Sequence, residues 1–357
     1  MRKPLICAAV MAVMATQAIS AQDTTLRILA LTGATVIDGT GAPAMPNMTV
    51  VIEKDRITQL YRTGERTLPP NAAARDLRGH YVIPGLIDAH VHVGAPHLQD
   101  GTMARLLRGG VTTVRNTVGN CSVLSDMARK AMAGEIEAPD IYYSATVGGA
   151  AMMADPRRVR PRAGAIGPGA GTPCGQLIGD SLKPMDVVSA SKGTGATGIK
   201  LYAAISARDA KRIIDEAHRQ GLVVWAHATL FPAKPSELVR DGADVLSHAA
   251  YLSWETVDSL PSYRSRVRLA PFNSAKPNDP AVERVLKMMA ERGTILDATL
   301  WLFHEQAMNP QPNPNEDFQV DRSTLEAAAK WADAVTRRAL CVSRIRLVLS
   351  SKGSRQT

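Results

Sequence analysis

The chain has 357 residues, of which 45% are hydrophobic and 4% are aromatic, and its formal net charge is +9 at pH 7. This length accommodates one large domain with a small accessory domain, and the hydrophobic content is sufficient for a well-buried core. The basic residues are scattered along the sequence without interleaved aromatic residues, a pattern that argues against nucleic-acid binding.

The N-terminal segment is typical of a secretory signal. Two basic residues precede an apolar run at about 5–13, and small residues follow. This pattern predicts a signal peptide over residues 1–21 and a periplasmic or secreted mature chain. The apolar run is shorter than the roughly 20 residues that a membrane span needs, so we expect no stable membrane span. Removal of the two basic residues would lower the net charge from +9 to +7.

Three cysteines would remain in the mature chain, at Cys121, Cys174 and Cys341. An odd number leaves at least one thiol unpaired within a monomer. Cys121 and Cys174 could pair, although nothing in their spacing favours it. The sequence contains neither a CxxC element nor the spacing of a zinc finger.

Residues 22–80 are expected to form a small N-terminal lobe of strands. Residues 26–39 and 48–62 alternate apolar and polar side chains, and glycine and proline residues punctuate the segments between them. Alternation with a period of two indicates strands with one buried face. We therefore predict a β-sandwich lobe, composite in the sense that it needs further strands to complete it.

From residue 81 to 357 the pattern changes to strands that alternate with helices. Helical periodicity covers 206–221 and 281–293, and each of these segments ends at a glycine. Strands that alternate with helices indicate an α/β fold with a parallel sheet, and eight of them favour a closed (β/α)8 TIM-like barrel. The expected strands are 81–91, 111–116, 141–146, 198–203, 223–228, 244–249, 295–300 and 345–350.

The connection over 147–197 is unusually long and is rich in glycine, proline and arginine. It follows the third strand, on the face where a barrel carries its site. We interpret it as a lid or substrate loop, the alternative being a disordered surface excursion. Arg157 in this loop could hold a substrate carboxylate, and the alternative is an ordinary solvated basic loop.

Histidines stand near the ends of three predicted strands. His90 and His92 are two residues apart on one strand, so they share a face and could bind one divalent ion. Asp88 could orient one of these imidazoles or simply cap the strand. His227 and His248 end the fifth and sixth strands, where the alternative to a ligand is a core histidine with its hydrogen bonds satisfied.

Six motifs in this order resemble those of the amidohydrolase superfamily, particularly its imidazolonepropionase-like and Xaa-Pro dipeptidase-like members. The resemblance covers nearly all of the predicted mature chain. The motifs are GATVIDGTGAP at 33–43, VIPGLIDAHVH at 82–92, GVTTVRN at 110–116, GIKLYA at 198–203, AHRQGLVVWAHA at 217–228 and GADVLSHA at 242–249.

The resemblance implies a centre of two divalent metal ions, usually zinc. It assigns His90 and His92 to the more buried ion and His227 and His248 to the other. Lys200 matches the family lysine that carbon dioxide carboxylates and that bridges both ions, whereas the alternative is a snorkelling surface lysine. A hydroxide between the ions would attack the substrate carbonyl.

The sequence departs from the family at the eighth strand, where relatives carry an aspartate that binds metal and shuttles a proton. The matching position is Lys352, and an ammonium cannot serve as that ligand. The helices and returning strands of the usual C-terminus are also missing, so we expect a truncated barrel and an incomplete sandwich. Asn116 replaces a common aspartate, and Ala150 stands where several relatives have histidine.

Together these features predict an exported metal-dependent hydrolase that cleaves a C–N bond in a cyclic amide or a peptide-like substrate. Tyr202 lies on the strand face of Lys200 and is a candidate for substrate contact. The substrate would be a small molecule or resemble a dipeptide. Two alternatives remain open: hydrolysis of esters, lactones or phosphotriesters at the same centre, and a truncated, inactive barrel without turnover.

Overall fold

The computed structural model describes residues 28–154, 173–179, 183–263, 271–309, 322–341 and 347–348. They fall into two compact units, which meet in the sequence at Pro84 and Gly85. The predicted signal segment, Arg157 and Lys352 lie outside the described residues. Among the described residues, no helix combines the length and the apolar character needed to cross a bilayer.

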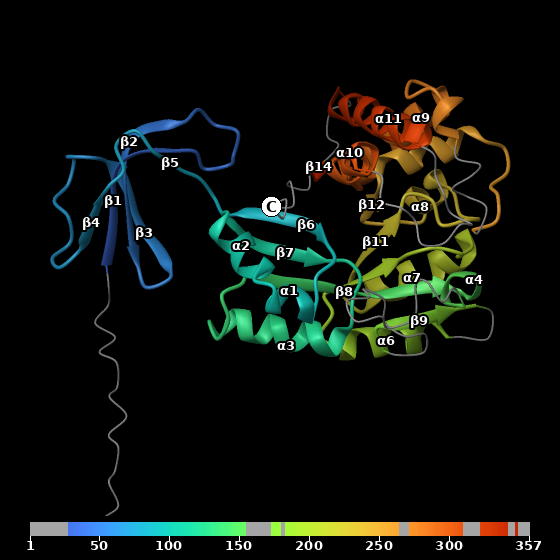
Figure 1. Ribbon diagram of the computed structural model, residues 1–357, viewed down its shortest axis with the longest axis horizontal. Coiled ribbons are helices and arrows are strands. Elements are labelled where there is room, and N and C mark those ends of the chain that lie inside the picture. Colours follow the sequence, from blue (N-terminus) through green and yellow to red (C-terminus); the bar gives the residue numbers. More distant parts are fainter. Residues whose placement is uncertain are drawn as a thin grey trace, which may run out of the picture. The chain divides into compact units, whose positions relative to one another are not determined.

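The N-terminal unit contains one sheet of five strands (Figure 1). β2 is antiparallel to β1 and β3, whereas β4 and β5 run parallel to β1. Val36, Met48 and Val50 form its small buried cluster. The predicted strand-rich lobe is therefore present, and the described residues supply one sheet of it. Its strands are β1 (Ile28–Val36), β2 (Met45–Glu53), β3 (Arg56–Arg62), β4 (Ala73–Asp76) and β5 (Tyr81–Val82).

The second unit carries eight parallel strands in the order β14-β13-β12-β11-β10-β8-β7-β6, which confirms the predicted TIM-like barrel (Figure 1). A further parallel strand, β9, pairs with β8 from within the long connection. The bounds are β6 (Leu86–Val91), β7 (Val111–Asn116), β8 (Asp140–Gly149), β9 (Gly175–Ile178), β10 (Gly198–Leu201), β11 (Val223–His227), β12 (Val245–Ser247), β13 (Ile295–Asp297) and β14 (Leu347–Val348).

Three details of the predicted strands are wrong. The expected first barrel strand, 81–91, is two strands, because β5 pairs with β1 in the N-terminal sheet and Pro84 separates it from β6. Proline has no backbone N–H to contribute to a ladder. The connection after the third strand contains β9, which the sequence pattern did not reveal. The strand expected at 295–300 ends at Asp297, because helix α10 begins at Leu300.

Helices occupy most connections between the barrel strands. The predicted helices at 206–221 and 281–293 correspond to α7 and α9. The bounds are α1 (Ala95–Gln99), α2 (Thr102–Arg108), α3 (Cys121–Met132), α4 (Ala150–Met153), α6 (Pro184–Gly193), α7 (Ala207–Arg219), α8 (Pro235–Arg240), η1 (Ala249–Thr256), η2 (Pro271–Asn273), α9 (Pro280–Arg292), α10 (Leu300–Met308) and α11 (Arg322–Cys341).

Local sequence explains where α7 begins and which face it buries. The Ser206 hydroxyl accepts a hydrogen bond from the backbone N–H of Asp209 at 3.1 Å, which satisfies a donor that the first helical turn would otherwise leave open. Ile213 and Ile214 lie on the buried face and are fully enclosed. The amphipathic pattern thus packs the helix against the barrel.

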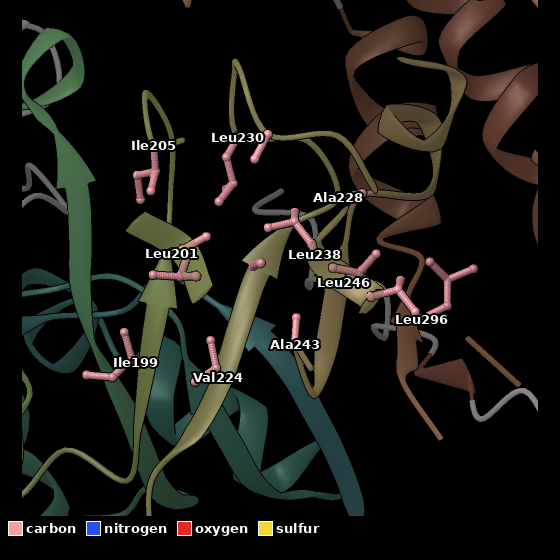
Figure 2. Close-up of a cluster of buried hydrophobic side chains, with 14 of the residues drawn as sticks. Ile199, Leu201, Ile205, Val224, Ala228, Leu230, Leu238, Ala243, Leu246 and Leu296 are labelled. Atoms are coloured by element: carbon pink, nitrogen blue, oxygen red, sulfur yellow. The ribbon is translucent and has the colours of Figure 1, made fainter. Parts of the chain in front are cut away.

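The main hydrophobic core takes alternate residues of the barrel strands. Successive side chains of a strand point to opposite faces, so these residues fix the direction of their neighbours. Lys200, Trp225, His227, Ser247 and Asp297 are those neighbours, and they face the barrel interior. Figure 2 shows the apolar set, which includes Ile199, Leu201, Val224, Leu246 and Leu296.

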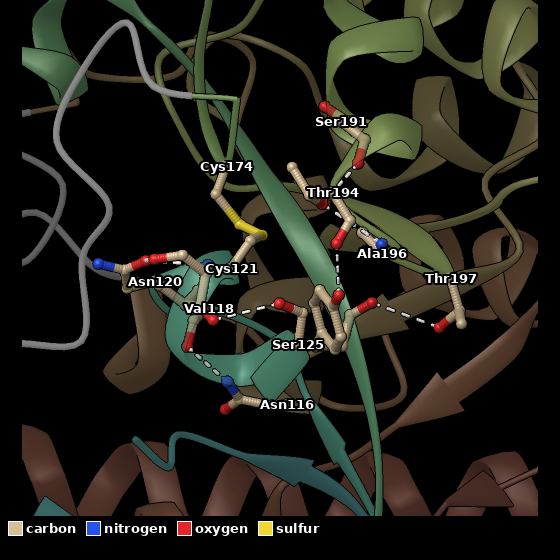
Figure 3. The surroundings of a disulfide bond; sticks show 12 residues. Asn116, Val118, Asn120, Cys121, Ser125, Cys174, Ser191, Thr194, Ala196 and Thr197 are labelled. Carbon is tan, nitrogen blue, oxygen red and sulfur yellow. Dashed lines mark hydrogen bonds between the residues drawn. A yellow bond between two sulfur atoms is a disulfide. The ribbon is translucent and has the colours of Figure 1, made fainter. Parts of the chain in front are cut away.

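Cys121 and Cys174 form a disulfide, with Cα atoms 5.6 Å apart (Figure 3). Cys121 is the first residue of α3, and Cys174 immediately precedes β9. The bond therefore ties the middle of the long connection, just before β9, to the helix that follows β7. This resolves the pairing that sequence spacing left open.

Candidate active site

Four histidine rings gather at the carboxyl ends of the barrel strands. The ring centroids of His90 and His92 are 5.3 Å apart, and those of His90 and His248 are 5.1 Å apart. His227 lies 4.5 Å from His248 by the same measure. The structure therefore brings together all four histidines that the sequence analysis named, although they come from three distant segments.

Strand register explains why side chains from successive strands lie at one level. His227 on β11 pairs with Ser247 on β12, and Ser247 pairs with Asp297 on β13. Neighbouring strands lie roughly 4.8 Å apart, so inward side chains at the same register are neighbours. Lys200 on β10 joins them through a hydrogen bond from its Nζ to Ser247 Oγ at 2.9 Å.

His248 reaches the site through its backbone conformation. Ser247 faces inward, so alternation alone would turn the next residue away from the interior. His248 instead has φ 73°, in the left-handed region that non-glycine residues seldom adopt. Thr299, with φ 48°, places its hydroxyl oxygen 2.9 Å from His248 Nδ1. Such strained backbone is concentrated at functional sites, and here it directs an imidazole toward the other histidines.

Asp297 is a site residue that the sequence analysis missed. Its Oδ2 accepts a hydrogen bond from His90 Nδ1, across the barrel. The other carboxylate oxygen, Oδ1, is buried and makes no hydrogen bond among the described residues. Burial raises the pKa of this carboxyl group, and His248 and Lys200 oppose that rise. The signal in the sequence was an acid at the end of a short apolar strand, ILD.

Lys200 is fully buried, so it is not the snorkelling surface lysine considered above. Burial lowers the pKa of its ammonium to about 7, with Asp297 opposing the change and Arg115 reinforcing it. A pKa near neutrality leaves a large fraction of the amine unprotonated at physiological pH. The neutral amine is the form that can act as a nucleophile.

Deeper in the barrel, Arg115 supplies a second buried cation. Its guanidinium stacks over the Trp225 ring at 4.3 Å from the centroid and donates a hydrogen bond to Ser144 Oγ at 3.1 Å. Burial lowers the pKa of Arg115 to about 10. Arg115 therefore remains charged at neutral pH, and it adds positive potential below Lys200.

His90 and His248 are held in the neutral form by their surroundings. Burial lowers the pKa values of His90 and His248 well below the usual range, and the nearby cation of Lys200 acts in the same direction. A neutral imidazole keeps one nitrogen lone pair available to a metal or a proton donor. The pair is thus chemically suited to ligation.

The remaining predicted residues take different positions. Tyr202 lies beside the site, with its ring centroid 4.2 Å from that of His227. Asp88 accepts a hydrogen bond from the backbone N–H of His90 at 3.2 Å, which holds the strand end. Asn116 is buried, and its amide oxygen accepts a hydrogen bond from the backbone N–H of Val93, so it braces the loop after β6.

The donor set fits a pair of divalent ions by its chemistry. Imidazole and carboxylate groups are ligands for zinc and related metals. The described residues do not contain three such groups already converged in the geometry of one metal ion. The buried oxygen of Asp297 without a hydrogen bond nevertheless marks an unused acceptor within the cluster. Binding would therefore require rearrangement of side chains that are already neighbours.

Comparisons with known proteins agree with this architecture. A Xaa-Pro dipeptidase structure with bound methionine has a TM-score of 0.68 at 17% identity, covering 92% of this chain and 80% of that one. An amidohydrolase structure has a TM-score of 0.64 at 19% identity, covering 90% and 77%.

Similarity detected from sequence alone covers a smaller part of the chain than the structural similarity does. An N-acyl-D-aspartate deacylase from Alcaligenes xylosoxydans xylosoxydans is 31% identical over 120 residues, which is 32% of this chain. The match spans 23% of the length of that curated relative. No family model matches the chain. The chain therefore shares the fold of these solved structures, which is the fold that the resemblance in its motifs predicted.

Proposed function

We propose that this protein is an exported, metal-dependent amidohydrolase that cleaves the C–N bond of a peptide-like or cyclic amide. The observation that carries the proposal is the convergence of four histidines and a buried lysine at the carboxyl ends of the barrel strands. The carboxyl ends of the strands form the face at which TIM barrels carry their chemistry.

Each member of the cluster has a role in this proposal. His90 and His92 would hold one divalent ion, His227 and His248 would hold the other, and Lys200 as a carbamate would supply an anionic oxygen ligand. When bound, the ions, zinc by preference, would lower the pKa of a water molecule and polarise the substrate carbonyl.

The surroundings of Lys200 favour its carboxylation. The neutral amine nitrogen would form a bond to the carbon of carbon dioxide while one C=O electron pair moves onto oxygen, and the nitrogen would release one proton to water, giving a carbamate with an anionic oxygen. Ser247 Oγ, 2.9 Å from Nζ, already fixes the direction of the side chain. The nearby guanidinium of Arg115 would stabilise the negative charge of the product.

Tyr202 would contact the substrate from one side of the histidine cluster. Its ring is a neighbour of His227, and Tyr251 lies on the same cluster with its ring centroid 6.0 Å from that of His227. Two amphipathic rings beside the reacting centre suit a small substrate that carries both apolar and polar groups. The names of the similar proteins point to Xaa-Pro dipeptides and N-acyl amino acids as the first compounds to test.

Export is supported by the disulfide between Cys121 and Cys174. Disulfides persist in oxidising compartments such as the bacterial periplasm and are rare in the cytosol. Together with the basic and apolar N-terminal segment, this bond supports a periplasmic or secreted location.

The test is metal content and turnover of the purified mature protein. We expect about two equivalents of zinc per chain, by analogy with binuclear sites. Lys200→Met should lose most of this zinc, whereas Lys287→Met, which removes an exposed lysine, should retain it. Protein prepared with zinc that binds none would overturn the proposal.

A substrate panel then separates the reaction classes. Xaa-Pro dipeptides, N-acyl amino acids and a cyclic amide represent C–N cleavage, and matched esters and a lactone represent the alternative. Turnover of amides that is lost in Lys200→Met would support the proposed function. Zinc-loaded protein that hydrolyses only the esters or the lactone would contradict it.

A further inference from the structure

We propose that Asp297 is a positioning residue that holds His90 in the tautomer protonated at Nδ1, so that the Nε2 lone pair is available to a metal ion. This inference rests on the proposed metal centre, but it concerns a residue on the seventh barrel strand that none of the sequence motifs includes. The inference gives the Asp297 carboxylate, which lies outside those motifs, a role in orienting one histidine of the cluster.

The contact is direct and enclosed. Asp297 Oδ2 accepts a hydrogen bond from His90 Nδ1, and the two side chains are 0% and 5% exposed. Water therefore does not compete for either group, and the bond has the directional control that low-dielectric surroundings provide. The two residues are 207 positions apart, so the contact depends on the barrel fold and not on local sequence.

Hydrogen-bond chemistry decides the tautomer. A neutral imidazole carries one N–H, and a carboxylate can only accept hydrogen bonds. Pairing with Asp297 therefore places the hydrogen on His90 Nδ1 and leaves Nε2 as the lone-pair nitrogen. Carboxylates that orient metal-binding histidines in this way fix the ring and raise its basicity.

A second residue on the same segment contacts another histidine of the cluster, through a hydroxyl that can donate or accept. Thr299, two residues after Asp297, lies with its hydroxyl oxygen 2.9 Å from His248 Nδ1. The end of β13 thus contacts the Nδ1 atoms of two histidines that come from β6 and from the end of β12.

Charge explains why an acid is tolerated here. Asp297 is buried, and the cationic groups of Lys200 and Arg115 attract its negative charge. A buried carboxylate without such cations would be costly. The Asp297 carboxylate therefore neutralises part of the buried positive charge and also orients His90.

The first test needs no substitution. Nitrogen-15 NMR of the metal-free protein reports which imidazole nitrogen of His90 carries hydrogen, and a His90→Gln variant assigns the signal. We expect the Nδ1–H tautomer in the wild-type protein. The Nε2–H tautomer as the major form would overturn the proposal, whether or not the protein binds metal.

The second test separates orientation from direct ligation. In Asp297→Asn the amide oxygen can still accept from Nδ1, so the tautomer should persist and zinc affinity should fall only a few-fold. In Asp297→Ala the tautomer should redistribute, and affinity should fall roughly 10- to 100-fold. Equal losses in both variants, with the tautomer unchanged, would mean that Asp297 binds metal itself and would overturn the positioning role.

Asp244 provides a matched control, because it is a second aspartate of the barrel that pairs with a histidine. Its Oδ2 lies 2.8 Å from His218 Nε2, and both side chains are substantially exposed. Asp244→Asn should leave both the His90 tautomer and zinc affinity at the wild-type values. A loss equal to that of Asp297→Ala would show a general effect of barrel stability and overturn the inference. Failure of the wild-type protein to bind zinc would instead refute the proposed function, with the tautomer result still standing.

Discussion

Replacing Lys200 with methionine should change how stability depends on pH. In the folded protein burial lowers the pKa of Lys200 to about 7, from an ordinary value of 10.5. Between these values the unfolded chain binds a proton at Lys200 that the folded chain does not. Stability from this group is therefore greatest at high pH and falls as pH drops toward 7, with a slope of up to about 1.4 kcal/mol per pH unit.

The two pKa values set the size of the effect. Between pH 9.5 and pH 7.5 they predict that this lysine lowers the free energy of unfolding by roughly 2–3 kcal/mol. Lys200→Met removes the titrating group and fills the same space with an apolar side chain. Over this interval the free energy of unfolding of Lys200→Met should therefore decline less than that of the wild-type protein, by roughly 2–3 kcal/mol.

The assay is urea unfolding of metal-free protein in buffers depleted of carbon dioxide, at half-unit steps from pH 7.5 to 9.5. Both conditions keep the lysine as a simple amine. Lys287→Met is the control for loss of an exposed lysine. If the free energies of unfolding of the wild-type protein and Lys200→Met change in parallel with pH, then Lys200 has the same pKa in the folded and unfolded states. That result would refute the reasoning from burial.

Three further changes test the fold. Leu246→Ala, at a fully buried core position, should cost about 2–5 kcal/mol in urea unfolding, and a cost below about 1 kcal/mol would contradict the packing. Ser206→Ala removes the cap of α7 and should cost about 1 kcal/mol in the same assay, whereas Ser206→Asn should cost less. Cys121→Ser opens a loop of 53 residues and should cost about 4 kcal/mol, and Cys174→Ser should match it if the two sulfurs are bonded to each other.

Periodicity was sufficient to predict the main architecture. Alternating strands and helices indicated the parallel barrel, and spacing placed His90 and His92 on one strand face. A parallel barrel strand such as β10 is buried on both faces, so its sequence is mostly apolar. A short apolar run such as GIKL therefore indicates a core strand. These features depend on residues that are close together in the sequence, so hydrophobic periodicity and residue spacing are enough to predict them.

Non-local pairings were harder to predict. The disulfide between Cys121 and Cys174 and the contact between His90 and Asp297 join segments that only the folded barrel brings together. The search for an acid was directed to the eighth strand, so Asp297 on the seventh was passed over. The left-handed turn at His248 was not predicted either, because histidine is enriched in that conformation relative to other non-glycine residues but still adopts it only rarely.

The contact between His90 and Asp297 has a consequence for the order of folding. It joins β6, at one end of the strand order, to β13, near the other end. Closing a flexible loop of 207 residues costs about 4.7 kcal/mol in chain entropy before any neighbouring strand compensates. The pair should therefore form after the intervening strands have assembled and the sheet has curved. Substitutions at Asp297 should then accelerate unfolding and leave the refolding rate nearly unchanged.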